Sequence, residues 1–431
     1  MKKRLISMAL CLAFGASMLA GCAKSGDTGT DSGDSAASAG EDVTIQMFIS
    51  SPEYADAINT LIAEYKKVKP NVSINYETTQ NDYPTLLKAK INAGECPDIF
   101  SSMSGKEIAV YGEYSQNLNG QPMADALDPA VRDLMTMNGE VHGIAIKGNL
   151  FGLVYNQGIF DEVGITQFPT TYSELEKACE TISAAGYTPF STGYAEWWVF
   201  KHMFQHFLDA AAPEDVEALM NELAAGNAHL KDYPAIYNDF FRFVDLTLKY
   251  GDAKPLESDL STEVAALGSG KTAMILGQGA WVEADILKID PSIKIGFNGY
   301  PLGDTPDASK VISGSDQAVR IYKDSKVLDE VFEFCNWWYT SDYGKTWFSD
   351  VTGVIPPISA GTMPDFEIVK QGNALIEQEG AATLAVAYAT DSFWQAFGEI
   401  MQGYVTGAKD KDTICSEIEA KWVELEGASQ S

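Results

Sequence analysis

Basic residues are scarce in this sequence. The chain of 431 residues carries 30 lysines and arginines against 60 aspartates and glutamates, so its formal net charge at pH 7 is −30. Binding to a nucleic acid or to an anionic bilayer needs a positively charged face that neutralises phosphate groups. The charge balance therefore argues against a nucleic-acid partner and favours an acidic, exported surface.

Cysteine is also scarce, with six residues and no Cys-X-X-Cys motif. Cys11 falls in the N-terminal apolar run and Cys22 directly follows it. The remaining four are widely spaced along the chain: Cys96, Cys179, Cys335 and Cys415. An exported protein could pair them, but several lie in apolar runs with helical spacing, which favours buried free thiols over disulfides.

The signatures of catalysis and of metal binding are missing or incomplete. No Gly-X-Ser-X-Gly motif is present. Gly268–Thr272 ends like a phosphate-binding loop, but Ala265 stands where that loop needs glycine, and a helical pattern precedes it instead of a strand. His202 and His206 have a spacing that could hold zinc, but Met203 replaces the glutamate of the catalytic motif, so packing on a helix face is the favoured interpretation. We expect no cofactor and no bound metal.

The N-terminus has the pattern of a lipoprotein leader. Lys2, Lys3 and Arg4 precede an apolar run from Leu5 to Leu19 that is shorter than a membrane span. The run ends in Leu-Ala-Gly-Cys at residues 19–22, which resembles a bacterial lipobox and predicts a diacylglycerol on Cys22. Two acyl chains suffice for stable anchoring. We therefore expect a signal peptide at 1–21, a flexible Ser/Gly-rich tether at 22–42, and no later membrane span.

The folded part opens with alternating strand and helix patterns, and a chain of this length is expected to form two lobes. Strands are predicted at Val43–Ile49, Val72–Thr78 and Pro97–Phe100, and helices at Tyr54–Val68 and Tyr83–Ala93. A β-α-β-α-β order predicts an α/β lobe with a doubly wound sheet. In such a sheet the ligand-binding groups lie at the carboxyl ends of the strands.

A longer stretch, Gly139–Ile165, has the pattern of a crossing between two compact units. Two extended apolar runs, Val141–Ile146 and Phe151–Tyr155, are joined by residues 147–149. A short helix then follows and is expected to end at Gly164, in the C′ position. The pattern predicts a strand that leaves one unit and enters the next.

This stretch resembles the first hinge segment of the extracytoplasmic solute-binding lipoproteins of ABC importers, in their carbohydrate-binding, maltose-binding-protein-like group. The segment Gly-X-X-Pro-Asp-Ile-Phe at 94–100 is a second similarity, and the order of such motifs extends from about Val43 to Leu425. The chain departs from the family pattern in having His142 where tyrosine is usual and no proline after Ile144.

The resemblance implies an α/β, two-lobed periplasmic-binding-protein-like fold with strands crossing near 148–153 and 293–298. The first lobe is expected at 43–152 plus 297–335, and the second at 153–296 plus 336–431. Such a protein binds a sugar or oligosaccharide in the interlobe cleft and delivers it to membrane permease subunits by hinge closure. It acts as a monomer, lipid-anchored to the outer face of the bacterial cytoplasmic membrane, and performs no catalysis.

Aromatic residues are the strongest candidates for ligand contacts. Tryptophan offers a flat apolar face to the C–H face of a sugar, and carboxylates and amides bind the hydroxyls. Trp281 ends a Gly-Gln-Gly-Ala-Trp segment that resembles a family turn whose tryptophan stacks on sugar, whereas Trp337 and Trp338 have the spacing of core residues. The full set of expected ligand-binding residues is Ser51, Glu53, Asp82, Ser102, Asn149, Tyr194, Glu196, Trp197, Trp281, Gly314, Asp316 and Trp394.

Two other functions remain open at this stage. A secreted carbohydrate-active enzyme would need two catalytic carboxylates about 5–10 Å apart in the cleft. A receptor for a non-sugar solute would need either basic residues for a phosphate ester or an acidic cage for a polyamine. Lys147 and Lys271 are the lysines near the candidate loops, and Glu53, Asp82, Glu196 and Asp316 would supply an acidic cage.

Overall fold

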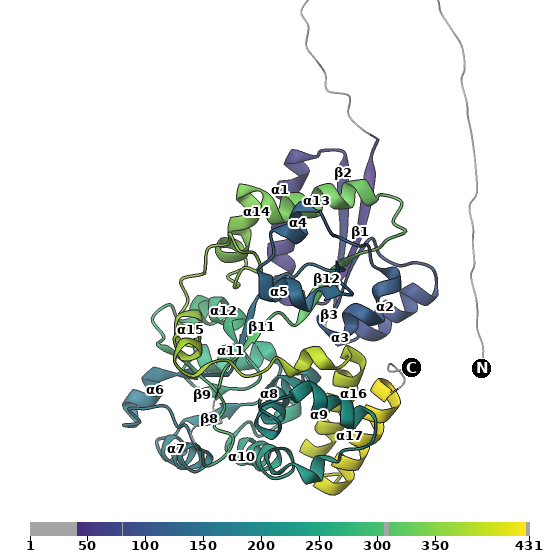
Figure 1. Ribbon diagram of the computed structural model, residues 1–431. Helices are drawn as coiled ribbons and strands as arrows, with labels where there is room; N and C mark the ends of the chain where they lie inside the picture. The colour runs from purple at the N-terminus through teal and green to yellow at the C-terminus, as the bar shows by residue number, and fades with distance from the viewer. Residues whose placement is uncertain (1–40, 80, 306–309, 428–431) are drawn as a thin grey trace, which may run out of the picture. The chain divides into compact units, whose positions relative to one another are not determined.

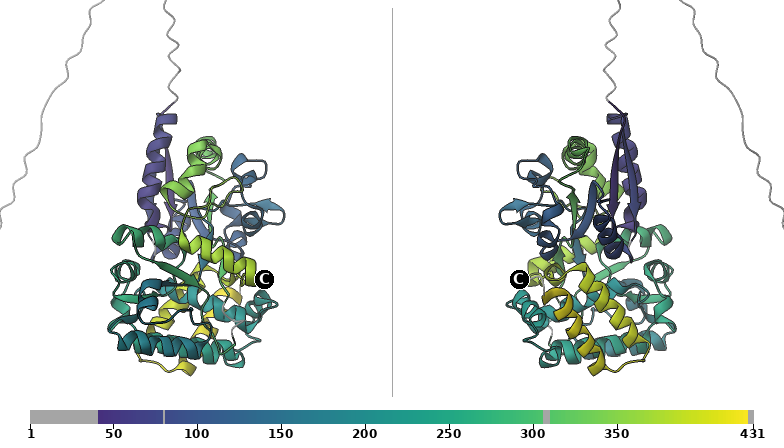
Figure 2. Two further views of the ribbon diagram at one scale, coloured as in Figure 1. Left: turned by 90° about the vertical axis from the view of Figure 1, so that its left-hand side faces the viewer. Right: turned by 90° about the vertical axis from the view of Figure 1, so that its right-hand side faces the viewer.

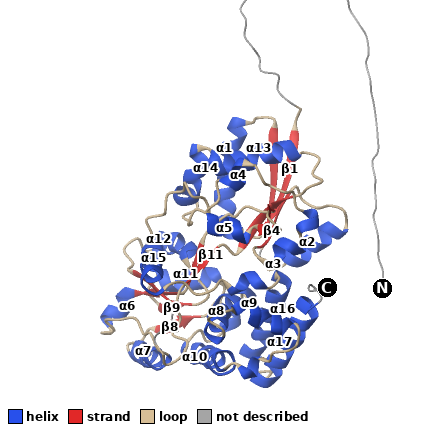
Figure 3. Ribbon diagram, viewed as in Figure 1, coloured by secondary structure: helices blue, strands red, loops and turns tan. Residues whose placement is uncertain are grey.

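The computed structural model describes residues 41–79, 81–305 and 310–427. The predicted signal peptide, Cys22 and most of the predicted tether lie outside these ranges. Figures 1 and 3 show that the described strands gather in two separate groups, each covered by helices. Within the described ranges, no helix has both the length and the apolar character needed to span a membrane.

The first lobe is built on a four-stranded sheet with the order β12-β3-β1-β2. Its strands are β1 (Val43–Ile49), β2 (Val72–Thr78), β3 (Ile99–Met103) and β12 (Gln317–Ile321). β1 pairs in parallel with β2 and β3, while β12 returns from later in the chain and pairs antiparallel with β3. The predicted bounds of β1 and β2 are confirmed. The third strand begins two residues later than the predicted Pro97 and extends beyond the predicted Phe100 to Met103.

Helices cover both faces of this sheet. They are α1 (Ala55–Val68), α2 (Tyr83–Asn92), α3 (Lys106–Val110), α4 (Pro122–Asp125), α5 (Pro129–Leu134), α13 (Leu328–Thr340) and α14 (Asp342–Thr346). Trp338, Trp347 and Ile358 pack in one hydrophobic cluster with Ile45 and Ile99 of the sheet. The predicted boundary at 335/336 is therefore wrong, because it cuts α13 in the middle and assigns these first-lobe core residues to the second lobe.

The second lobe has its own four-stranded sheet, with the order β10-β7-β9-β8. Its strands are β7 (Leu153–Asn156), β8 (Thr188–Ser191), β9 (Thr272–Ile275) and β10 (Ile295–Asn298). Its helices are α6 (Gln157–Glu162), α7 (Tyr172–Ala184), α8 (Trp197–Ala211), α9 (Val216–Ala224), α10 (Phe241–Tyr250), α11 (Leu260–Gly268), α12 (Glu283–Ile289), α15 (Glu367–Glu379), α16 (Asp391–Val405) and α17 (Lys411–Glu426).

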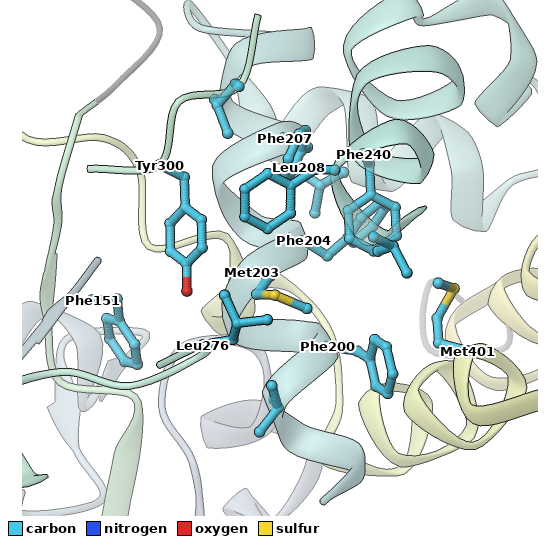
Figure 4. Close-up of a cluster of buried hydrophobic side chains, with 14 of the residues drawn as sticks. Phe151, Phe200, Met203, Phe204, Phe207, Leu208, Phe240, Leu276, Tyr300 and Met401 are labelled. Atoms are coloured by element: carbon cyan, nitrogen blue, oxygen red, sulfur yellow. The ribbon is translucent and has the colours of Figure 1, made fainter. Parts of the chain in front are cut away.

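The long helix α8 is the centre of the second lobe. Phe200, Met203 and Phe204 on this helix belong with Phe240 to one apolar cluster (Figure 4). The C-terminal helices α16 and α17, yellow in Figure 2, pack on the same lobe. All twelve residues from Trp197 to Leu208 are buried, as expected of a helix at the centre of a lobe.

The two lobes are joined by a pair of short antiparallel strands, β6 (Asn149–Phe151) and β11 (Ile312–Gly314). The predicted crossing near 148–153 agrees with β6. The predicted second crossing at 293–298 is wrong, since β10 pairs along its length with β7 inside the second sheet. The predicted strand at Val141–Ile146 is also wrong: β5 covers only Glu140–Val141, and the rest is buried irregular chain.

Two local predictions agree with the structure. Gly164 closes α6 with a positive φ of 79°, a conformation that glycine adopts without strain. Cys96, Cys179, Cys335 and Cys415 are free thiols, and burial raises the pKa of Cys96 and Cys415 to about 12. The glycine-rich segment after α11 leads from a helix into β9, the reverse of the strand-to-helix order of a phosphate-binding loop.

Candidate functional site

A cavity of about 620 Å³ lies between the two lobes, a volume typical of small-molecule sites. The first lobe and the crossing segments contribute Pro52, Glu53, Lys147, Asn149, Asp316 and Gln317 to its wall. The second lobe contributes Glu196, Trp198, Lys201, His202, Trp281 and Lys288 among others. A second hollow of about 360 Å³ shares Glu53, Trp281, Asp285 and Lys288 with it, so the cleft continues past the Trp281 ring.

Trp281 lies in a short 3-10 helix (Ala280–Val282) just after β9, and its ring packs against three hydrophobic clusters that include both lobes. Its Nε1 donates to Gln278 Oε1 at 3.0 Å, and Gln278 Nε2 donates to Glu263 Oε2 at 2.6 Å. Gln278 and Glu263 are both fully buried, and burial raises the pKa of Glu263. This chain of hydrogen bonds fixes the indole in the cleft wall.

Glycine is required next to this tryptophan. A Cβ added to Gly279 would lie 2.0 Å from the Leu150 carbonyl oxygen and 2.5 Å from the Trp281 ring. Leu150 belongs to β6, so the turn that carries Trp281 packs directly against the crossing strand. Any side chain at 279 would push the ring away from the strand that joins the lobes.

One face of α8 lines the cleft. Trp198, Lys201 and His202 are separated by three and four residues, the spacing that aligns side chains on a helix. His202 Nδ1 lies 2.9 Å from the Gly277 carbonyl oxygen, which can only accept, so Nδ1 carries the proton. Burial first, and then the Lys201 charge, lower the pKa of His202 well below its usual value. The imidazole is therefore a neutral part of the wall, in edge contact with Trp281.

Four charged or polar groups meet where the chain crosses between the lobes. Asn149 Nδ2 donates to Asp316 Oδ1 at 2.5 Å, which ties β6 to the loop after β11. The Lys147 ammonium lies 3.4 Å from Glu53 Oε1. Burial alone would lower the pKa of Lys147, but the oxygens of Tyr54, Glu53 and Asp316 outweigh it and raise the pKa.

The structure brings five of the predicted ligand residues together in the cleft: Glu53, Asn149, Glu196, Trp281 and Asp316. Ser51 lies directly behind the wall, where its Oγ donates to Gln317 Oε1 at 3.0 Å. Gly314 pairs with Asn149 in the crossing strands, and a Cβ there would meet Leu384 at 2.7 Å.

The other predicted residues lie outside the cavity wall. Asp82 is exposed beside α2 and is not part of the cavity wall. Ser102 lies within β3, where its Oγ accepts from Arg320 Nε. Three aromatic residues are in the core of the second lobe: Tyr194, Trp197 and Trp394. Tyr194 bonds Thr247 at 2.7 Å, and Trp394 Nε1 donates to the Val386 carbonyl at 3.0 Å. None of these three aromatic residues lines the cavity.

The sequence analysis did not identify Trp198, Lys201 and His202 as a group that lines the cleft. The signal was present, because their spacing places them on one helix face while Trp197, Phe200 and Phe204 share another. Asp259, Asp285 and Lys288 also line the cleft, but they are half-buried or exposed charges of a kind that occurs throughout the chain. In the part of the chain that the structure describes, no group of three or more His, Cys, Asp or Glu is arranged to hold a metal ion.

Two α/β lobes, a pair of crossing strands and an aromatic, polar cleft between the lobes define a ligand-binding protein of the two-lobed type. A family model described as "Bacterial extracellular solute-binding protein" matches residues 50–345, and the chain belongs to that family.

Two relatives are similar over most of their length. The melibiose/raffinose/stachyose-binding protein of Bacillus subtilis is 25% identical over 315 residues, which covers 70% of each chain. The multiple sugar-binding protein of Streptococcus mutans is 23% identical over 316 residues, 72% of this chain and 74% of that protein. Both relatives are binding proteins rather than enzymes.

Solved structures show the same fold. A sugar transporter protein of Bacillus licheniformis in complex with stachyose superposes with a TM-score of 0.76 at 20% identity and covers 89% of this chain and 100% of that one. A chitin oligosaccharide binding protein also has a TM-score of 0.76, at 18% identity, and covers 90% of this chain and 100% of that chain. The predicted two-lobed fold is confirmed.

Proposed function

We propose that this protein is the substrate-binding component of an ABC importer that captures a neutral sugar or oligosaccharide outside the membrane. The observation that carries the proposal is the position of Trp281. Its indole is fixed by buried Gln278, stands in the wall of the interlobe cleft, and has Asn149 and Asp316 across the same cavity. A flat apolar face beside amide and carboxylate groups is the combination that a sugar ring requires.

Sugar binding closes the lobes on the ligand in this proposal. Glu53 and Trp281 belong to different lobes and line the same cavity, so a ligand that contacts both gains contacts when the lobes approach. The short strands β6 and β11 are the elements that absorb the hinge rotation. The closed form is then the one that the permease subunits recognise.

Binding without turnover fits the cleft better than hydrolysis does. Each of the five carboxylates that line the cavity has a hydrogen-bond or ion-pair partner: Glu53 with Lys147, Glu196 with Trp198, Asp259 with Thr262, Asp285 with Lys288, and Asp316 with Asn149. Asp259 caps α11, so its role is structural. A glycosidase needs two carboxyl groups free to act on one glycosidic bond.

A thermal-shift screen tests the proposal. Mono- and oligosaccharides, polyamines and glycerophosphates are compared at equal concentration, because a ligand that binds the folded state raises its melting temperature. At 100 times the dissociation constant the stabilisation is about 2.7 kcal/mol. We expect the rise with neutral saccharides. A rise with a polyamine or a glycerophosphate alone would overturn the proposal.

The lipid anchor is part of the same proposal and rests on the Leu-Ala-Gly-Cys sequence at 19–22. Replacing Cys22 with alanine removes the thiol that receives the diacylglycerol, so we expect the variant to leave the membrane fraction and appear in the medium. Cell fractionation and blotting measure this. Cys96→Ala, at one of the free thiols of the folded part, is the matched control and should stay membrane-bound. Retention of Cys22→Ala in the membrane would contradict the anchor.

A further inference from the structure

Lys147 stands where the chain enters the crossing strand β6, and its side chain is inside the cleft rather than in solvent. Only 6% of the residue is exposed. Its backbone is fixed from the other crossing segment, because Ser315 Oγ donates to the Lys147 carbonyl oxygen at 2.6 Å. The position of this ammonium is therefore set by the hinge and not by a flexible surface loop.

Two aromatic faces, one from each lobe, receive the ammonium. Lys147 Nζ lies 5.1 Å from the centroid of the Tyr54 ring and 5.2 Å from that of the Trp281 ring. The carboxylate of Glu53 is 3.4 Å away, and Asp316 lines the same cavity. We refer to Glu53, Tyr54, Trp281 and Asp316 as the ammonium cage.

Aromatic faces combined with carboxylates are the groups that bind alkylammonium ions, since the ring quadrupole and the negative charge both attract a cation. In this protein the chain's own lysine satisfies those groups. We propose that Lys147 fills an ammonium-binding site in the cleft and thereby determines selectivity, excluding cationic ligands such as polyamines and amino sugars in favour of neutral ones.

The physical basis of this selectivity is charge repulsion. A second cation at the Trp281 face would meet the fixed like charge of Lys147, while Glu53 and Asp316 are already partnered by Lys147 and Asn149. A neutral sugar meets no such penalty, and the ammonium is placed to donate to its hydroxyls. The inference rests on the proposed function only in using the same cleft, because the cage can be tested without any sugar.

The test is chemical rescue. Lys147→Ala removes Cγ, Cδ, Cε and Nζ, which together correspond to n-propylammonium. We expect n-propylammonium to bind the variant about tenfold or more tightly than the wild-type protein, as measured by thermal shift and by titration calorimetry at constant ionic strength. Neutral 1-propanol, at equal concentration, should not bind. If Lys147→Ala folds only with n-propylammonium present, that result also supports the cage.

Lys288→Ala is the matched control. Lys288 lines the same cavity, but it is exposed and paired with Asp285. We expect no rescue of that variant by n-propylammonium.

Should Lys147→Ala fail to fold in either solution, Lys147→Ser provides a second vacant cage for the same titration. Equal binding of n-propylammonium to the wild-type protein and to the Lys147 variant, or binding to neither, would overturn the inference. A failed sugar screen with successful rescue would reject the proposed function and leave the cage intact.

Discussion

Trp281→Ala should weaken saccharide binding by roughly 2–4 kcal/mol, which is about a 30- to 1000-fold loss of affinity. The indole provides a flat apolar surface in the cleft wall, held in place by a hydrogen bond from its Nε1 to Gln278. Removing it leaves the sugar face without a platform and opens the Lys147 ammonium to water. The folding stability should fall less than for a core tryptophan, because Trp281 is only partly buried. Titration calorimetry and denaturant unfolding measure the two effects.

Trp337→Ala is the control for this substitution. Trp337 is also partly buried, and its ring stacks on that of Tyr343. It lies on α13 and is not part of the cavity wall. Its loss should leave affinity unchanged. Trp281→Phe should recover part of the affinity lost in Trp281→Ala, since a smaller ring remains. A large loss of stability with unchanged affinity in Trp281→Ala would mean that this ring is a core residue.

Trp394→Ala should have the opposite pattern, with a loss of about 3–5 kcal/mol of folding stability and little change in the affinity of the folded protein. The residue is fully buried in the second lobe, where its ring contacts Phe393 and Phe397. Its Nε1 donates to the Val386 carbonyl oxygen, which the substitution would leave without that donor. Urea unfolding monitored by circular dichroism gives the change in stability.

Trp394→Phe is the conservative partner of that variant and should cost less, because a ring still fills most of the space. Saccharide titration of both variants separates the two possible roles. A tenfold or greater loss of affinity in Trp394→Ala with stability preserved would show that Trp394 contacts the ligand, as predicted from the sequence.

Helices and strands could be predicted from the sequence wherever one of their faces is buried and the other is exposed to solvent. β2 alternates exposed residues with buried or half-buried ones, so its period of two was visible. The irregular segment after Val141 was mistaken for a strand for the opposite reason. Ile144, Ala145 and Ile146 are all fully buried, and a buried irregular chain has the same apolar composition as a buried strand. Only the hydrogen bonds of the folded protein distinguish the two.

The candidate site was predictable only in part, because a cleft and a core both attract aromatic residues. Trp281 could be recognised from the glycines before it, of which Gly279 lies too close to β6 for any side chain. Tyr194 and Trp394 are also large aromatic residues, but their side chains make their hydrogen bonds inside the second lobe. Trp197 was predicted, whereas its neighbour Trp198 lines the cavity, because one residue along α8 turns the side chain by about 100°. The ammonium cage needs groups from distant parts of the chain and could not be found from local sequence.

The structure of the protein with a saccharide bound is the most direct test of the central claim. We expect a sugar ring stacked on the Trp281 indole, with hydroxyls bonded to cleft residues of both lobes, including Asn149 or Asp316, and with the Lys147 ammonium still held beside Glu53. A saccharide bound outside the cavity, or held by one lobe alone, would contradict the account.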